Sequence, residues 1–276
     1  MRLAILIRVY NRINDLSANL KVIRELWKKF NNAFVIVAFN GKSDGYELPE
    51  IVFKYADKVL QYENNSGHLK GNSQLILESY NYIPEDTEFL VILEADTWLL
   101  DDSLISKYLN IMDNRDIAWC SSEWRNLTYS LGIDFAILNF NLLKGFYKDL
   151  FNFDKNPEEW VADFLIQKGL KFLYIRELMP VHIPKILSSF FRLKDRRLRI
   201  FLKGKMITHH IECLKNGIED KYAIANCIIN SQFFYTSVKK NCFIMKIFYF
   251  FLPYLLMVTP QSSWFKSKKH IFLRYI

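Results

Sequence analysis

Two carboxylates, Glu94 and Asp96, close an apolar run in residues 91–102, VILEADTWLLDD. Unpaired carboxylates are costly to bury, so a buried strand that ends in two acids should expose them or use them to hold a cation. Side chains alternate along a strand, and residues 94 and 96 would therefore point to the same face. Their oxygen atoms suit Mg²⁺ or Mn²⁺, and such an ion could neutralise a diphosphate leaving group. The alternative is a solvated strand end whose carboxylates cap the following turn.

A second acidic pair, Glu158 and Glu159, follows Asn156 and Pro157. Transfer of a group to a hydroxyl requires a base that takes the hydroxyl proton, and a carboxylate can do this. The pair stands at the start of an expected helix that ends before Gly169. Acidic residues also favour the first turn of a helix because of the helix dipole, and Asn-Pro-Glu-Glu is a good helix start. Both interpretations of the pair stay open at this point.

The composition is that of a globular chain that can bury a sizeable core: 276 residues, 51% hydrophobic and 24% charged. The net charge of +8 suits anionic partners such as nucleotide phosphates or an acidic membrane face. We find no helix-turn-helix, zinc-finger or RNP-type signature, so nucleic acid is not expected as a partner. The four cysteines lie far apart without a CxxC pair, which predicts free thiols and neither a zinc site nor a disulfide framework.

The first ~180 residues alternate between strand-like and helix-like patterns, which predicts an α/β layer fold. Strands are expected at 3–9, 33–40, 59–62 and 89–96, and helices at 14–30 and 73–82. Polar residues follow the carboxyl ends of these strands, where open α/β sheets bind their ligands. The acidic pair of the opening stretch lies at one of these strand ends, so a binding site is expected along that edge.

The composition changes near residue 185, and residues 186–276 are expected to form a basic, aromatic, helical C-terminal extension. Residues 242–260, CFIMKIFYFFLPYLLMVTP, are almost wholly apolar and precede the basic stretch SWFKSKKHIFLRYI. Lys246 and Pro253 interrupt the apolar run, so an in-plane or re-entrant segment fits better than a spanning helix. The sequence therefore predicts a chain peripheral on an anionic membrane surface, on the cytoplasmic, inner face. A buried helical hairpin or an oligomer face is the alternative.

Five stretches, in order, resemble the inverting family 2 glycosyltransferases with the GT-A fold: IRVYNR, AFNGKSDG, GHLKGNSQLI, EADTW and PEEWVADFLIQKGLKFLYIRELMPVHIP. The resemblance covers about residues 1–185, the expected catalytic domain. It implies a Rossmann-like α/β fold with a mixed, mainly parallel sheet flanked by helices. It also implies transfer of a sugar, with inversion, from a nucleotide-diphosphate sugar (a UDP-sugar first of all), assisted by Mn²⁺ or Mg²⁺.

The resemblance also implies roles for individual residues. The residues expected around the nucleotide and its diphosphate are Arg8, Val9, Tyr10, Asn11, Asn40, Asp44, Lys70, Gly71, Asn72, Glu94, Ala95 and Asp96. Asn72 is expected to begin a helix, where capping alone would also explain it. The expected metal ligands are Asp96, Glu94 and His182, with His209 and His210 as rivals of His182. Glu159 is the first candidate for the base and Glu158 the second.

Some features depart from the family pattern. Glu94 replaces the more usual first Asp of the metal motif, and the Gln-x-x-Arg-Trp pattern of processive synthases is absent. We therefore expect transfer of a single sugar to a glycan or lipid-linked acceptor in cell-surface polysaccharide synthesis. Trp119, Trp124, Arg125 and Asp134 are candidates for the sugar pocket, although aromatic residues there are more often core. The alternative functions are a catalytically degenerate GT-A-fold binding or scaffold protein and a nucleotidyltransferase.

Overall fold

The structure is a computed structural model that describes residues 1–123, 130–178, 199–209, 214 and 216–237. Its main sheet has seven strands in the order β3-β2-β1-β4-β7-β6-β8. These strands are β1 (Leu3–Val9), β2 (Phe34–Phe39), β3 (Lys58–Gln61), β4 (Phe89–Glu94), β6 (Ile117–Glu123), β7 (Leu131–Asn139) and β8 (Lys171–Tyr174). Only β7 pairs antiparallel with its neighbours in this sheet. The predicted fold class, a mixed, mainly parallel sheet flanked by helices, is confirmed.

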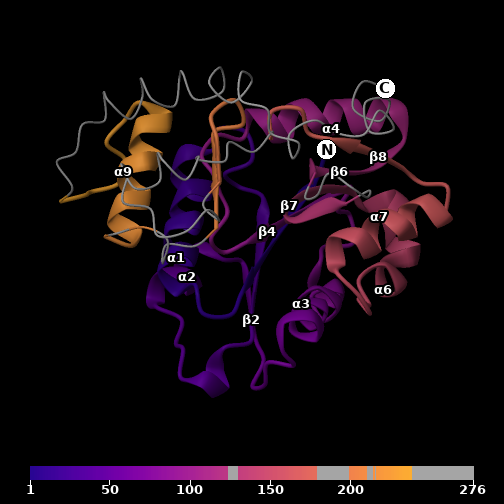
Figure 1. Ribbon diagram of the computed structural model, residues 1–276, viewed down its shortest axis with the longest axis horizontal. Helices are drawn as coiled ribbons and strands as arrows, with labels where there is room; N and C mark the ends of the chain where they lie inside the picture. The colour runs from indigo at the N-terminus through magenta and orange to yellow at the C-terminus, as the bar shows by residue number, and fades with distance from the viewer. Residues whose placement is uncertain (124–129, 179–198, 210–213, 215, 238–276) are drawn as a thin grey trace, which may run out of the picture.

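Helices cover both faces of the sheet (Figure 1). One face packs against α1 (Ile13–Lys21), α2 (Glu50–Tyr55), α4 (Ser103–Arg115) and α9 (Ile218–Ile229). The other face packs against α3 (His68–Leu77), α5 (Phe140–Leu143), α6 (Tyr147–Leu150) and α7 (Pro157–Gln167). In β1, Ile5 and Ile7 belong to the first core and Ala4 and Leu6 to the second. This explains the continuous apolar runs of the central strands, since both faces are buried.

A second, three-stranded sheet joins the later part of the chain to the first part. Its order is β5 (Trp98–Leu99), β10 (Met206–Thr208) and β9 (Arg199–Phe201), all antiparallel. Ile200, Met206 and Ile224 lie in the same hydrophobic core as Ile5 of the central strand. The described residues between 199 and 237 are therefore part of the main body, with strands as well as a helix. The expected domain boundary near 185 and the apolar run 242–260 lie outside the described residues.

The predicted elements agree with the structure in type, and some bounds differ. The helix expected at 14–30 is α1, which continues as a π-helical turn, Val22–Leu26, and ends there. The helix expected at 73–82 begins earlier, at His68, and ends at Leu77. Gly67, with φ 87°, makes the turn before it, a backbone conformation that glycine adopts readily.

The structure also bears on the expectations about the cysteines and about membrane-spanning helices. Cys120 is a buried free thiol, whereas Cys227 in α9 is disulfide-bonded, so the expectation of free thiols is wrong for Cys227. Among the described helices, none has the length and apolar character that crossing a bilayer requires.

Candidate active site

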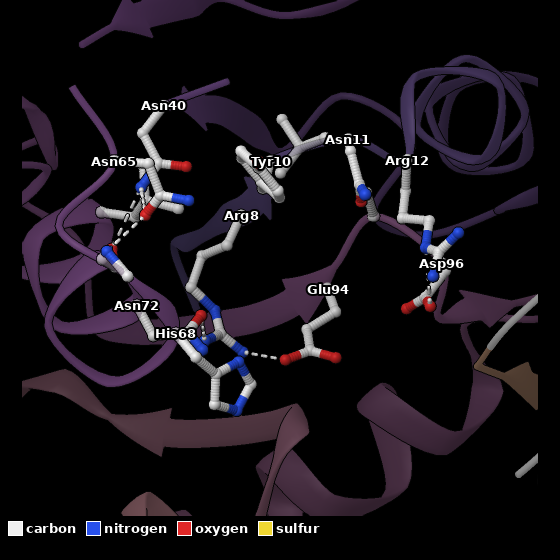
Figure 2. A pocket seen from close by; sticks show the side chains of 15 residues that line it. Arg8, Tyr10, Asn11, Arg12, Asn40, Asn65, His68, Asn72, Glu94 and Asp96 are labelled. Atoms are coloured by element: carbon white, nitrogen blue, oxygen red, sulfur yellow. Dashed lines mark hydrogen bonds and ion pairs between the residues drawn. The ribbon is translucent and has the colours of Figure 1, made fainter. Parts of the chain in front are cut away.

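A pocket opens at the carboxyl ends of β1 and β4, the two neighbouring strands at the centre of the sheet (Figure 2). In the sheet, β2 lies beside β1 on one side, and β7 lies beside β4 on the other side. The chain therefore leaves β1 toward one edge of the sheet, whereas the strands of this sheet that come after β4 lie toward the other edge. Such a point of diverging connections is where open α/β sheets bind ligands. The pocket has about 700 Å³ of space, including its open mouth. Its lining residues are Arg8, Val9, Tyr10, Asn11, Arg12, Asn40, Asn65, Gly67, His68, Gly71, Asn72, Leu75, Glu94, Ala95 and Asp96.

Most residues expected around the nucleotide line this pocket. The exceptions are Asp44 and Lys70. Asp44 is connected to the pocket through Tyr10, whose hydroxyl donates a hydrogen bond of 2.9 Å to Asp44 Oδ2. This bond raises the pKa of Tyr10. Lys70 is an exposed residue of α3 and does not line the pocket.

The acidic pair forms a turn at the end of β4, called here the acidic turn, residues 94–97. Glu94 is the last residue of the strand, and the Thr97 amide donates to the Glu94 carbonyl at 3.0 Å. Asp96 is therefore part of a turn and not of the strand, so the expected strand alternation does not apply to it. The two carboxylates nevertheless lie together, and a ligand atom of His209 completes a group in which all three atoms are within 4.8 Å of one another.

His209 reaches this group because of the second sheet. It follows β10 directly, and β10 pairs with β5, the strand that comes after the acidic turn. His209 has a φ of 72°, an uncommon conformation for a residue other than glycine. Of the three histidines considered from the sequence, His209 is the one that the described structure brings to the acids. His182 and His210 lie outside the described residues.

The residues present fit a divalent cation. Two carboxylates and one imidazole are a donor set that Mn²⁺ accepts. Burial raises the pKa of Glu94 to about 8, against the opposing effect of Arg8, and the negative charges of Asp96, Asp134 and Glu158 raise it further. Asp134 Oδ1 is also buried, without a hydrogen-bond partner among the described residues. Such a concentration of acids is stabilised by a bound cation.

Arg8 lines the pocket as expected, and its guanidinium is held by several neighbouring elements. Its guanidinium is 1% exposed, donates to Asn72 Oδ1 at 2.7 Å and to the Ile133 carbonyl at 2.5 Å, and lies 3.3 Å from Glu94 Oε1. It thus connects β1, α3, β4 and β7 at the pocket wall (Figure 2). Arg12 lies at the rim, where its Nε is 3.9 Å from Asp96 Oδ2.

Asn72 does not begin a helix, which corrects the expectation from the sequence. Helix α3 begins at His68, and the preceding Gly67 carbonyl accepts from the Gly71 amide at 2.7 Å. Asn72 is in the second turn, where its side chain accepts the bond from Arg8 instead of capping the helix. A Cβ at residue 71 would lie 2.3 Å from Asn65 Oδ1, so any side chain there would displace the Asn65 side chain from its place at the pocket.

Asn65 and His68 line the pocket too, although neither is among the residues expected there from the sequence. The polar run around them, NNSGHLKGN, was a usable signal, because such a run before a helix lines one end of a sheet.

Glu158 and Glu159 both lie in the first turn of α7, and Asn156 caps that helix by accepting from the Glu159 amide at 3.4 Å. The charge of Glu158 contributes to the raised pKa of Glu94 and opposes the lowering of the pKa of Arg199 by burial. The charge of Glu159 acts on Lys155, which pairs with Asp163. Glu158 is thus the glutamate of the pair whose charge acts on the acidic turn, whereas the sequence placed Glu159 first.

The candidates for a sugar pocket separate in the structure. Trp119 is fully buried in the core, as the alternative interpretation holds, and Trp124 and Arg125 lie outside the described residues. Asp134 lies beside the acidic turn instead. Its Oδ2 accepts a 3.2 Å hydrogen bond from Thr208 and lies 4.0 Å from His209 Nε2.

No protein-family model matches the chain, and no curated protein is similar to it. Several solved structures resemble it at a distance. The mannosyltransferase PcManGT of Pyrobaculum calidifontis, in complex with GDP-Man and Mn²⁺, is 15% identical with a TM-score of 0.49, over 63% of this chain and 54% of that one. S. aureus TarS 1–349 with UDP-GlcNAc is 16% identical with a TM-score of 0.39, over 55% and 52%. The chain thus matches about half of each of these two proteins.

A third neighbour is the 4-diphosphocytidyl-2C-methyl-D-erythritol synthase of Anaerococcus prevotii. It is 10% identical with a TM-score of 0.43, over 63% of this chain and 89% of that one. These likenesses are too distant to assign a family, an activity or a ligand to this chain.

Proposed function

We propose that the chain is a metal-dependent glycosyltransferase that moves a single sugar from a nucleotide-diphosphate sugar to a hydroxyl acceptor. One observation carries the proposal: Glu94, Asp96 and His209 converge beside a pocket at the diverging point of an α/β sheet. A carboxylate-rich cation site in an open pocket can neutralise the charge of a departing diphosphate. The resemblance of five sequence stretches to family 2 glycosyltransferases gives independent support.

The pocket divides into a base side and a diphosphate side. Tyr10 and Asn40 would lie at the base side, where the Tyr10 ring offers a stacking face. Asp44, bonded to the Tyr10 hydroxyl beside the pocket, would offer an acceptor for a base N–H. These groups suit uracil, so we propose UDP-sugar as the donor. At the other side, Asp96, Glu94 and His209 would hold Mn²⁺ or Mg²⁺, which supplies charge neutralisation of the diphosphate when bound. Arg12 at the rim adds a cationic group for the same anion.

Glu158 is the proposed base. It lies in the first turn of α7, and its charge contributes to the raised pKa of Glu94 in the acidic turn. A carboxylate can accept the proton of a hydroxyl group. It would take the proton of the acceptor hydroxyl as that oxygen attacks the anomeric carbon, and inversion follows from a single displacement.

The acceptor and the location come from the sequence. We propose a glycan or lipid-linked acceptor presented at an anionic membrane surface, because the basic and apolar residues 242–276 suit such a surface. The disulfide at Cys227 is uncommon in a reducing cytosol. We therefore propose attachment to an anionic membrane surface without assigning a compartment.

The test is hydrolysis of a panel of nucleotide sugars by the wild-type chain, with Mn²⁺ and with EDTA. We expect turnover of one donor with Mn²⁺, its loss in EDTA, and its loss in Asp96→Asn. Turnover undiminished in Asp96→Asn would refute the assignment. Nucleotide binding without turnover of any donor would favour the degenerate binding protein, and release of pyrophosphate from a nucleoside triphosphate would favour the nucleotidyltransferase.

A further inference from the structure

Lys221 in α9 is a fully buried lysine whose polar partners belong to other elements. Its Nζ donates to Asp15 Oδ1 in α1 at 2.5 Å and to the main-chain carbonyl of Asp96 at 2.6 Å. The same ammonium lies 4.0 Å from the centre of the Trp98 ring. Both Lys221 and Asp15 have 0% side-chain exposure. The contact to Asp96 is made to the residue that we place at the metal.

A second buried side chain holds the rest of the acidic turn. Asn19 Nδ2 donates to the Thr97 carbonyl at 2.8 Å and lies 3.4 Å from the carbonyls of Glu94 and Ala95. Together with Lys221, every carbonyl of residues 94–97 therefore faces a buried donor. These contacts to main-chain carbonyls hold the backbone from which the Glu94 and Asp96 carboxylates extend.

The aromatic residues around Lys221 tie α9 to the same turn. Trp98 stacks on Tyr222 and Phe234 at ring-centre distances of 5.7 and 5.4 Å. Its indole N–H donates to the Asp15 carbonyl at 3.1 Å. The acidic turn, α1 and α9 thus form one packed unit, and Lys221 is the residue that reaches from α9 to the turn itself.

Stability alone is a poor explanation for this ion pair. The desolvation of two buried charges offsets much of their attraction, and apolar residues of similar size often serve as well. An apolar side chain at 221 would, however, leave the Asp96 carbonyl buried without its donor. The specific contact to that carbonyl is what the lysine provides and an apolar residue lacks.

We propose that Lys221 is a positioning residue for the cation site: it fixes the main chain of Asp96 and makes α9 part of the binding of the divalent ion. This inference rests on the proposed function, because it takes Asp96 as a ligand. Groups that hold metal ligands in place typically change metal affinity by about 10–100-fold when they are removed.

The experiment measures binding of Mn²⁺ alone, through the electron paramagnetic resonance signal of the free ion. The test variant is Asp15→Asn/Lys221→Met, which removes both charges of the pair together. We expect its Mn²⁺ Kd to rise by about tenfold or more. The rescue variant, Asp15→Asn/Lys221→Gln, restores a donor and should return most of the affinity.

A matched control separates positioning from a loss of packing. Asn226 is on the same helix. Its Nδ2 donates to the Phe234 carbonyl at 2.7 Å, and its Oδ1 accepts from the Phe234 main-chain amide at 2.9 Å, so neither bond involves the acidic turn. Asn226→Leu should lower the melting temperature but keep the Mn²⁺ Kd within about threefold, because it removes no partner of the acidic turn.

A measurement on the wild type does not depend on whether a variant folds. Saturating Mn²⁺ should slow amide hydrogen exchange at residues 94–98 and also at residues 218–224 of α9, because coupling between two sites is reciprocal. Exchange in α2 should stay unchanged. Slower exchange at 94–98 with unchanged α9 overturns the inference.

The outcomes distinguish the inference from the proposed function. A wild-type chain that binds no Mn²⁺ contradicts the proposed metal site, and the inference with it. A wild type that binds Mn²⁺, together with a folded Asp15→Asn/Lys221→Met variant of the same affinity within about threefold, overturns only the role of Lys221. If that variant does not fold, the exchange pattern of the wild type decides.

Discussion

At the scale of single residues, the site separates groups that do chemistry from groups that hold them. The charge of Glu158 contributes to the raised pKa of Glu94, whereas the charge of Glu159 contributes to the raised pKa of Lys155. Arg8 is buried and holds Glu94 and Asn72, while Arg12 remains at the rim beside Asp96. Chemically similar neighbours in the sequence therefore have different roles, and each pair gives a matched comparison.

The two glutamates of α7 provide the first comparison. Glu158→Gln should lower kcat for donor hydrolysis by about a hundredfold or more, since a lost general base typically costs that much. The same reaction in Glu159→Gln should stay within about threefold of wild type, because its charge lies toward Lys155. Steady-state kinetics measure both, with the donor Kd as a check on folding. The opposite ranking of the two variants would return the role of base to Glu159.

The two arginines provide the second. Arg8→Met should lower the free energy of unfolding by about 3 kcal/mol, because it leaves the partly buried Glu94 carboxylate and the buried Ile133 carbonyl without their partner. Arg12→Met should cost less than about 1 kcal/mol in stability and weaken nucleotide diphosphate binding instead. Urea denaturation and nucleotide titration of both variants check this. A stable Arg8→Met variant with weakened nucleotide binding would instead assign Arg8 to the phosphates.

At the scale of elements, the second sheet positions the site, and a surface ion pair supports it. Asp101, two residues after β5, accepts from Lys205 Nζ at 2.9 Å, and the Lys205 carbonyl accepts from the Leu100 amide at 2.8 Å. Lys205 comes directly before β10. Burial alone would raise the pKa of Asp101, but hydrogen bonds from Ser103 and Lys205 outweigh it and lower the pKa to about 2.

This lowered pKa predicts how stability depends on pH. A carboxyl group whose folded pKa lies below its unfolded value, about 3.9, stabilises the fold above that value and loses the effect as the pH falls toward 2. Asp101→Asn should therefore cost up to about 1 kcal/mol at pH 7, given the partial exposure of Lys205, and progressively less below pH 4. Urea denaturation across this range measures the difference. A deficit that is independent of pH would contradict the electrostatic account.

The sequence predicted the strands well because their apolar runs are continuous and their ends are polar. It placed the pocket correctly for the same reason, since the carboxyl ends of β1, β2 and β4 meet at one edge. It misplaced the start of α3, because Gly71-Asn72 has the composition of a helix cap while Gly67 makes the turn. It placed His182 first and His209 only as a rival, since the position of His209 depends on the pairing of β10 with β5, about a hundred residues earlier.

At the scale of the whole molecule, residues 199–237 complete the site that residues 1–178 begin. His209 and Lys221 both come from this later part, and both reach the acidic turn. The pocket and the cation site are therefore one folded unit. The basic residues that follow position 262 lie beyond it in the sequence and carry the proposed attachment to a membrane surface.

That attachment is tested with vesicles. The wild-type chain should float with vesicles rich in phosphatidylglycerol, should bind phosphatidylcholine vesicles more weakly, and should lose binding as salt rises. Replacing Lys266, Lys268 and Lys269 together by Gln should weaken binding to the anionic vesicles, by about 1 kcal/mol for each lysine near the surface. Donor hydrolysis should be unaffected. Binding that ignores lipid charge, salt and these lysines would contradict an electrostatic attachment.

The proposed function requires that the acidic turn bind a divalent ion and, through it, a nucleotide diphosphate. Isothermal titration of UDP into the wild-type chain and into Asp96→Asn, each with Mn²⁺ and with EDTA, tests it most directly. We expect the wild type to bind UDP in the presence of Mn²⁺. The affinity for UDP should be at least about tenfold weaker when EDTA replaces Mn²⁺, and also in Asp96→Asn. Equal UDP affinity under all four conditions, or no UDP binding by the wild type with Mn²⁺, would contradict it.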